Sequence, residues 1–321
     1  MYPVIEKVLD NEQTYQSLVK QLINTVVFSD YQITGFNTLC THTQTITFLV
    51  NKRLVVKLSV SDRLSQNDVA KCYTNWRLNN IPTLDVIASG STERFEYLVT
   101  KYIEAIDGNK LALQSHQSFN LASELGTIAA KLHSSKPSEI SYLNSGVDSF
   151  DTWLKYNRQK LDRRCDRLYA KGLLSNKEMR RVKNKFEGLQ ERDCELVELH
   201  GDLTPFNVLA DSESGSVKAL HDPDSLFGDP LHEVAYFTQS IKRQYKNLQS
   251  SKAMKDTGNY PEIERFTSSY KNQAGIKFSA KDISVINIYE SALYINKLDY
   301  RSNFDPDNEL PLIKELFLET L

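Results

Sequence analysis

Apolar residues in the first third of the chain recur mainly at the two-residue spacing of β-strands. Residues 45–50 and 54–58 are runs of apolar and β-branched residues joined by a polar turn, so we expect a β-hairpin there. Similar patterns predict strands at 86–88 and 95–100, an amphipathic helix or pair of helices within 1–28, and a helix over 65–78. The pattern therefore indicates a small β-rich unit that carries few helices.

Beyond Gly108 the spacing becomes mostly helical. A buried stripe is expected on one helix at Leu121, Leu125, Ile128, Ala129 and Leu132. Ser175 and Glu178 have the spacing of a capping box, which predicts a helix that begins there. A short hairpin is expected at 208–209 and 217–220, and helical spacing returns from Glu233 to the end. Strands followed by helices predict an α+β fold with two lobes.

Composition and charge narrow the range of functions. Of the 321 residues 40% are hydrophobic and 25% charged, an ordinary globular composition long enough for a sizeable core. Thirty-nine basic residues stand against 41 acidic ones without a dense basic block, so we expect no nucleic-acid partner. The four cysteines are widely spaced and form no CxxC pair, which argues against a disulfide framework or a zinc site.

Two further patterns concern location. The first residues lack a basic segment followed by an apolar one, so we expect no signal peptide. No apolar run reaches the roughly 18 residues that a membrane span needs. We expect a cytoplasmic protein with no membrane partner.

The densest chemistry lies between residues 199 and 230. Asp202 and Asn207 are five positions apart on a loop that leads into an apolar strand. The sequence His221-Asp222-Pro223-Asp224 follows the predicted hairpin, and Gly228-Asp229-Pro230 comes soon after it. Four of the carboxylates in this stretch and one amide thus occur on the loops that flank the predicted hairpin.

Phosphoryl transfer needs oxygen ligands of these kinds. One carboxylate accepts or orients the attacking hydroxyl, and further oxygens hold Mg²⁺ against the triphosphate. We therefore predict Asp202 as the base or hydroxyl-positioning group, with Asn207 and Asp222 as metal ligands. Asp224 is either a second ligand or a solvated turn residue. Asp229 is expected to anchor the catalytic loop, and His200 to have a structural role.

These motifs resemble those of the aminoglycoside phosphotransferase and choline kinase-like superfamily, in which a His-Gly-Asp loop replaces the His-Arg-Asp of protein kinases. The resemblance extends in order over roughly residues 40–240, from Val55-Val56-Lys57 through Leu132-His133 to Gly228-Asp229-Pro230. It implies a two-lobed protein kinase-like fold, with a small β-rich N-lobe at 1–101 and a larger, mainly helical C-lobe at 102–321. It also implies ATP and Mg²⁺ as cofactors.

The resemblance assigns further residues to the nucleotide. Lys57 corresponds to the family's phosphate-contacting lysine, with an exposed edge lysine as the alternative. Thr100 and Tyr102 belong to a segment that resembles the family's hinge strand, and Thr43 and Gln44 lie where its phosphate-covering loop is expected.

Two features depart from the family pattern. The phosphate-covering loop is poor in glycine, and no Glu occurs between Lys57 and Thr92 to position the lysine. The partner of Lys57 is expected to be Asp68 or a neutral residue such as Asn75. For Asp68, a role in helix capping is an equal alternative.

Three hypotheses follow for the whole protein. The leading one is a small-molecule kinase that binds nucleotide and phosphorylates a hydroxyl of a sugar, amino sugar or amino alcohol. The second is a catalytically weak or inactive kinase-like module that acts through a partner, and the third is a protein kinase. The acceptor is expected to contact the helices at about 140–190 and near the C-terminus. Acids there (Asp148, Asp151, Asp299, Asp305, Asp307 and Glu309) are interspersed with bases, so a solvated mixed surface is favoured over an acidic pocket.

Overall fold

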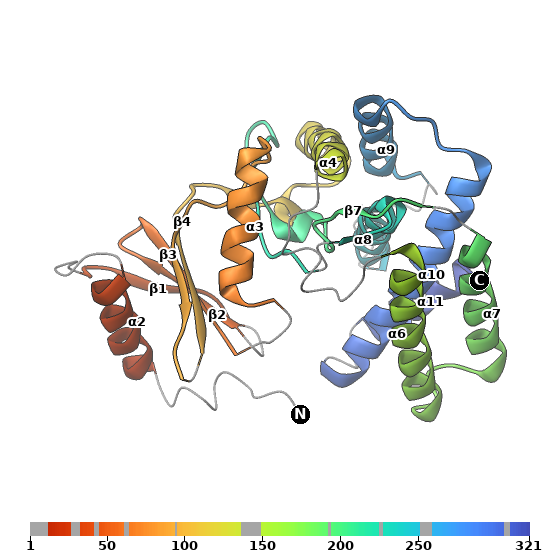
Figure 1. Cartoon of the computed structure of the whole chain (residues 1–321), viewed down its shortest axis with the longest axis horizontal. Coiled ribbons are helices and arrows are strands. Elements are labelled where there is room, and N and C mark those ends of the chain that lie inside the picture. The colour runs from red at the N-terminus through yellow and green to blue at the C-terminus, as the bar shows by residue number, and fades with distance from the viewer. Residues whose placement is uncertain are drawn as a thin grey trace. The chain divides into compact units, whose positions relative to one another are not determined.

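The computed structural model describes residues 12–26, 33–41, 45–60, 64–93, 95–135, 149–191, 194–224, 227–250, 259–304 and 309–321. It divides into two compact units, one of Met1–Ile106 with Lys218–Asp224 and one of Asp107–Val217 with Ser225–Leu321. The first unit contains an antiparallel sheet and the second is mostly helical (Figure 1). The expected α+β fold is confirmed.

The sheet of the first unit has the order β1-β2-β3-β5-β4, and every neighbouring pair is antiparallel. Its strands are β1 (Phe36–Thr41), β2 (Thr45–Val50), β3 (Leu54–Ser59), β4 (Val86–Ser91) and β5 (Glu96–Lys101). Four of them lie where apolar alternation predicted them. The edge strand β1 was not predicted, because its polar residues Asn37 and Thr38 interrupt the apolar alternation.

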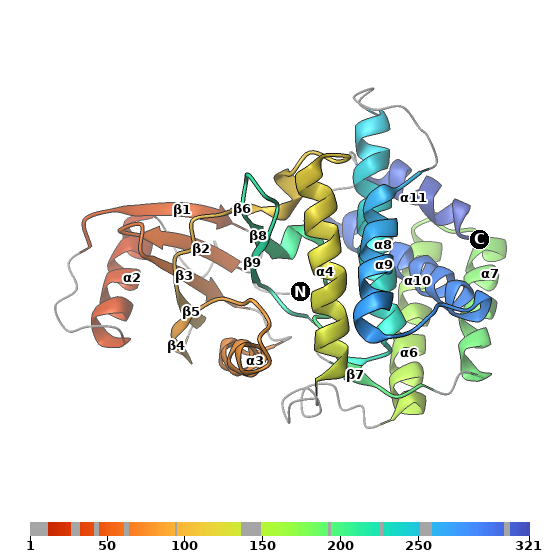
Figure 2. The same cartoon turned by 90° about the horizontal axis from the view of Figure 1, so that it is seen from above.

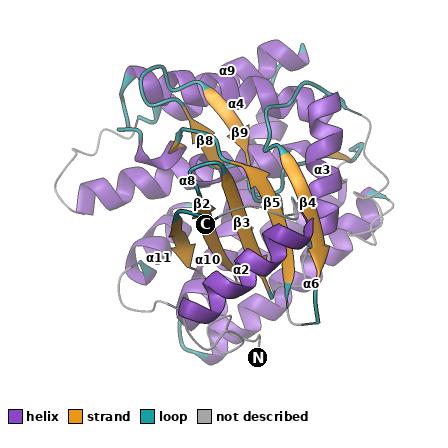
Figure 3. Ribbon diagram, turned by 90° about the vertical axis from the view of Figure 1, so that its left-hand side faces the viewer, coloured by secondary structure: helices purple, strands orange, loops and turns teal. Residues whose placement is uncertain are grey.

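Helix α2 (Glu12–Val26) packs on one face of this sheet. Its residues Val19, Leu22 and Ile23 share a core with buried residues of β2 and β3, and Figure 3 shows the helix lying across the strands. Helix α3 (Gln66–Leu78) lies on the other side of the sheet in Figure 1, where it packs against β4 and β5. Residues of β2 and β3 that face α2 are buried, whereas alternate residues on the other face of these strands stay partly exposed.

The second unit is built around long helices. They are α4 (His116–Ser134), α6 (Phe150–Ala170), α7 (Asn176–Glu187), α8 (Pro230–Ser250), α9 (Pro261–Ala274), α10 (Ala280–Phe304) and α11 (Leu310–Glu319). Helices α4 and α9 pack side by side (Figure 2) and approach closely at Gly126, where a Cβ atom would lie 2.2 Å from the carbonyl oxygen of Phe266. Only glycine allows this approach.

The expected stripe on α4 is buried, and the capping box of Ser175 and Glu178 begins α7, so both predictions are confirmed. Helix α10 contacts α6, α7, α8 and α11 and buries Tyr289 and Tyr294 completely. Among the helices that the structure describes, none has the length and apolar character needed to cross a membrane.

Short elements connect these helices. They are β6 (Ile106–Asp107), β7 (Val197–Glu198), β8 (Val208–Ala210), β9 (Val217–Leu220), β10 (Phe227–Gly228) and the 3₁₀ turns η1 (Gly108–Lys110), η2 (Gly188–Glu191) and η3 (Pro205–Asn207). Strands β7 and β10 pair antiparallel, with Glu198 opposite Phe227. The strands expected at 208–209 and 217–220 are confirmed as β8 and β9.

Candidate functional site

The loop between β7 and η3 carries Asp202. The apolar residues Leu199 and Leu203 on either side of it are buried, and His200 is fully buried between them. Gly201 has a φ of 81°, a left-handed backbone conformation that glycine adopts without strain. This glycine lets the chain turn sharply, so that Asp202 remains partly open while its neighbours are buried.

Glu233, in the first turns of α8, holds this loop in place. Its Oε1 accepts a hydrogen bond of 2.7 Å from the backbone N–H of Gly201. Its Oε2 lies 2.9 Å from Nε2 of His133, whose Nδ1 lies 2.8 Å from the hydroxyl of Tyr270. Burial opposes ionisation of Glu233, but the hydrogen bond and charge of His133 outweigh it and lower the pKa of this carboxyl. The loop is thus fixed by a buried network from three helices.

We name the residues Gly201, Glu233, His133 and Tyr270 the loop anchor. Asp229 was also expected to anchor the catalytic loop, and this stays a prediction. Its Oδ1 accepts from the backbone N–H of Leu231 and its Oδ2 from the hydroxyl of Tyr289. Those bonds orient the start of α8, and the bond to Gly201 comes from Glu233, one turn further along the helix. The sequence motifs did not predict this role for Glu233.

Asn207 ends the same loop. Its Nδ2 donates a hydrogen bond of 2.8 Å to the carbonyl oxygen of Asp202. This bond orients the amide group, so that Oδ1 is the atom of Asn207 that could bind a metal ion. Magnesium prefers oxygen ligands of this kind. The structure therefore couples the orientation of Asn207 to the backbone of Asp202.

In the first unit, Lys57 on β3 lies 2.5 Å from Oδ1 of Asp222. The backbone N–H of Asp222 donates to the hydroxyl of buried Tyr73 on α3, and Nδ1 of His221 lies 3.4 Å from Oδ2 of Asp222. Desolvation opposes ionisation, but the charge of Lys57 and the bond from His221 lower the pKa of Asp222 well below its usual range. Asp222 has a φ of 55°, which is rare for residues other than glycine.

The structure corrects the expected partner of Lys57. The oxygen bonded to Lys57 belongs to Asp222, and neither Asp68 nor Asn75 fills that role. Asp68 accepts a hydrogen bond of 2.7 Å from the hydroxyl of Ser65 at the start of α3, and the backbone N–H of Asp68 donates to that hydroxyl in return. A capping carboxylate near a helix start is favourable, so the capping alternative is confirmed.

The remaining predicted residues are placed as follows. Thr100 is buried on β5 beside β3, and the backbone N–H of Tyr102, whose side chain is exposed, donates to the carbonyl of Arg53. Asp224 follows Asp222 and is partly buried. Thr43 and Gln44 lie outside the described residues. Within the part of the chain that the structure describes, no group of three or more His, Cys, Asp or Glu residues could hold a metal ion.

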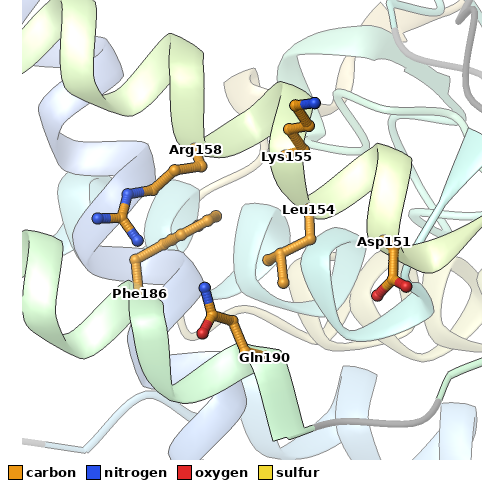
Figure 4. A pocket seen from close by; sticks show the side chains of 6 residues that line it. All are labelled: Asp151, Leu154, Lys155, Arg158, Phe186 and Gln190. Carbon is orange, nitrogen blue, oxygen red and sulfur yellow. The ribbon is translucent and has the colours of Figure 1, made fainter.

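A cavity of about 380 Å³ lies between α6 and the segment from α7 to η2 (Figure 4). Asp151 lies at one end and Arg158 at the other, with Lys155 between them and Leu154, Phe186 and Gln190 completing the wall. Arg158 is paired with Glu187 at 2.7 Å. Because acidic and basic side chains line this cavity together, it is not the acidic pocket that a cationic amine acceptor would need. Asp148, Asp305 and Asp307 lie outside the described residues.

A basic residue near Asp202 was also missed. Arg243 on α8 is only 8% exposed, and its guanidinium carbon lies 5.6 Å from the ring centroid of Phe206 in η3. No motif includes it, because its place beside the loop depends on the packing of α8.

Solved structures with a similar fold support a kinase-like architecture. The GDP complex of aminoglycoside 2'-phosphotransferase-IIIa matches with a TM-score of 0.67 and 15% identity, covering 94% of this chain and 97% of that one. A choline/ethanolamine kinase family protein from Mesorhizobium loti matches with a TM-score of 0.62 and 14% identity, covering 95% and 93%. The streptomycin–ATP ternary complex of APH(2")-IIa matches at 0.61 and 15%, covering 94% and 96%.

A comparison with curated proteins found no match. The model of the phosphotransferase enzyme family matches residues 47–254, which is more than half of the 321-residue chain. This match includes most of β2, all of β3 to β5, the loop of Asp202 and all of α8. The chain is therefore a member of the phosphotransferase enzyme family.

Proposed function

We propose that this protein is an ATP-dependent kinase that transfers the γ-phosphoryl group to a hydroxyl of a small molecule such as a sugar, amino sugar or amino alcohol. The observation that carries the proposal is the loop anchor, which fixes the backbone beside a partly open Asp202. Solved complexes of similar fold hold GDP, or ATP with streptomycin, which supports nucleotide use and a small acceptor.

Asp202 is the proposed catalytic residue. It accepts a hydrogen bond from the acceptor hydroxyl and takes its proton as the new oxygen–phosphorus bond forms. The bond between the γ-phosphorus and the bridging oxygen breaks, and ADP leaves with the electron pair. Most of the rate enhancement comes from positioning and charge stabilisation, and a preformed loop serves both.

Asn207 and Asp222 are the proposed metal ligands, with Asp224 as a further one. The amide oxygen of Asn207 and the ionised carboxylate of Asp222 are hard oxygen donors, so their chemistry fits Mg²⁺. When bound, the ion neutralises charge on the phosphates.

Residues 1–101 are proposed as the nucleotide-binding lobe and 102–321 as the lobe that carries the catalytic loop. Lys57 contacts the phosphates, Thr100 and Tyr102 contact the base, and Thr43 and Gln44 belong to the phosphate loop. The ion pair of Lys57 and Asp222 supports this assignment. Phosphates that share a metal ion with Asp222 would lie close to the ammonium group of Lys57.

Asp202→Asn and Asp222→Ala test these roles. In Asp202→Asn we expect turnover to fall about a thousandfold, on the scale of a lost catalytic base, with ATP affinity within about twofold of wild type. In Asp222→Ala we expect Mg²⁺-dependent ATP binding to be lost. ADP release measured on a panel of hydroxyl compounds, with calorimetry of Mg·ATP binding, gives both quantities.

The inactive-module alternative is motivated by the glycine-poor phosphate loop. A thermal-shift titration with ATP, with and without Mg²⁺, separates the two hypotheses. Absence of a shift under both conditions would argue against the kinase, as would wild-type turnover in Asp202→Asn.

A further inference from the structure

The backbone around the proposed metal ligand Asp222 is fastened to α3 and to the segment that follows this helix. The backbone N–H of Asp222 donates a hydrogen bond of 2.9 Å to the hydroxyl of Tyr73 on α3. Two positions earlier, the backbone N–H of Leu220 donates to the carbonyl oxygen of Pro82 at 3.0 Å, and Leu220 forms a parallel bridge with Thr83. The chain is therefore held both at Asp222 and just before it.

Asp222 needs this support because its backbone conformation is unfavourable. Its φ of 55° lies in the left-handed region, where the Cβ atom of a residue other than glycine is crowded. Such conformations persist only where the surrounding structure imposes them, and they are common at functional sites. Here three groups act together, since Lys57 bonds Oδ1, His221 lies 3.4 Å from Oδ2 and Tyr73 holds the N–H.

Tyr73 is the rigid member of these three groups. It is only 1% exposed, and its ring centroid lies 6.0 Å from that of the fully buried Trp76. Burial and the charge of Asp222 raise the pKa of the Tyr73 hydroxyl well above its ordinary value. The hydroxyl therefore stays neutral and accepts the N–H without placing a second negative charge beside the carboxylate of Asp222.

Helix α3 carries no glutamate that could position Lys57, and its one acid, Asp68, bonds Ser65 at the helix start. We propose that Tyr73 takes the place of the missing helix glutamate as a positioning residue, which fixes the backbone of Asp222 in the conformation from which its carboxylate binds Mg²⁺. Helix α3 thus acts on the metal ligand and not on the lysine. The inference rests on the proposed function, in which Asp222 binds the metal ion.

This role separates the backbone of Asp222 from its side chain. The carboxylate is 48% exposed and can exchange Lys57 for a metal ion, while the N–H stays bonded to Tyr73. Removal of a group that orients a metal ligand typically lowers metal affinity about 10- to 100-fold. Loss of the Tyr73 hydroxyl should therefore weaken metal-dependent binding and leave metal-free binding of nucleotide intact.

Calorimetry of ADP binding to the full chain, with Mg²⁺ and with EDTA, measures this effect. In Tyr73→Phe we expect the affinity for Mg·ADP to fall at least about tenfold, with the affinity for ADP in EDTA within about twofold of wild type. Tyr245→Phe is the matched control, because it removes the hydroxyl of another buried tyrosine, which donates to Glu262 at 2.7 Å. The control should leave both affinities at the wild-type level.

Two further measurements distinguish positioning from a general role in the fold. In the Asp222→Ala background, Tyr73→Phe should change ADP affinity by less than about twofold, because its effect passes through Asp222. In protein labelled with ¹⁵N-aspartate and ¹⁵N-leucine, hydrogen exchange of the Asp222 N–H should become at least about tenfold faster in Tyr73→Phe. The N–H of Leu220, which keeps its bond to Pro82, should exchange at the wild-type rate.

Equal Mg·ADP affinity in wild type and Tyr73→Phe would overturn the positioning role. An equal loss in Tyr245→Phe, or a loss in Tyr73→Phe that is as large in EDTA, would overturn it too. Mg²⁺-independent binding of ADP by wild type would contradict both this role and the proposed metal site.

Transfer assays with ATP keep the two proposals separate. Transfer to a hydroxyl compound that Tyr73→Phe leaves unchanged at limiting Mg²⁺ would refute the positioning role and leave the kinase intact. Mg·ADP affinity that depends on Tyr73, without transfer to any compound of the panel, would support the positioning role and count against the kinase.

Discussion

The loop anchor and the pair of Lys57 and Asp222 are built differently. The carboxylate of Glu233 is fully buried and bonds a backbone N–H and a buried histidine. The side chains of Lys57 and Asp222 are 22% and 48% exposed. Buried charge-assisted bonds are strong and geometrically restrictive, whereas open ion pairs contribute about 0–1 kcal/mol. We infer that the loop is shaped before ligands bind, while the open pair can exchange its partners for phosphate and metal.

The strongest test of this difference removes the charge of Glu233. Glu233→Gln places an NH₂ group or a neutral oxygen where Gly201 and His133 need a carboxylate. Breaking a buried pair of this kind costs about 3–5 kcal/mol, so we expect a large loss of unfolding free energy and at least a hundredfold loss of turnover. Urea unfolding and ADP release measure the two effects.

Glu262→Gln is the matched control for that variant. Glu262 is also a buried carboxylate of the second unit, accepting from the hydroxyls of Ser118 and Tyr245 and from the backbone N–H of Gln114. It should lose comparable stability but keep turnover at temperatures where it is folded. Equal losses of turnover in both variants would mean that Glu233 acts only through global stability.

Lys57→Ala tests the open pair. Because an exposed ion pair contributes little, we expect the unfolding free energy to change by less than about 1 kcal/mol. Mg·ATP affinity should fall about tenfold or more, as the cation that faces the phosphates is removed. Lys101→Ala, which breaks the exposed pair of Lys101 with Asp85 at 3.2 Å on neighbouring β5, is the control. A similar loss of ATP affinity in the control would remove the special role of Lys57.

The pH dependence of stability should also distinguish the buried anchor. Because the pKa of Glu233 in the folded protein is lowered from its ordinary 4.5, its contribution is complete above that value. It is lost as the pH falls through the folded pKa, with a slope of at most about 1.4 kcal/mol per pH unit for one proton. Unfolding by urea from about pH 6 to about pH 3 should show a shallower decline for Glu233→Gln. Parallel curves for the two proteins would contradict the lowered pKa.

The smallest effect is expected at Asp68. Asp68→Ala removes a carboxylate that accepts from Ser65 in the first turn of α3, and should cost about 0.5–1 kcal/mol. ATP affinity should stay at the wild-type level, because the partner of Lys57 is Asp222. If ATP affinity fell in Asp68→Ala as it does in Lys57→Ala, Asp68 would be the working partner of the lysine.

Local pattern was enough to determine much of this protein. Alternation predicted β2 to β5, helical spacing predicted α3 and α4, and the spacing of Ser175 and Glu178 predicted the start of α7. The order of the motifs around Asp202 was sufficient to indicate the family. These features depend on residues within a few positions of each other, where backbone geometry decides which side chains meet.

Tertiary packing alone decided which groups support the site. Glu233 meets Gly201 across 32 positions and His133 across 100, and Lys57 meets Asp222 across 165. No periodicity encodes such pairs, because they depend on how helices and strands pack rather than on the local backbone. The same holds for Arg243, whose sequence suggests only an ordinary helix residue. Its burial beside Phe206 follows from the position of α8 against the catalytic loop.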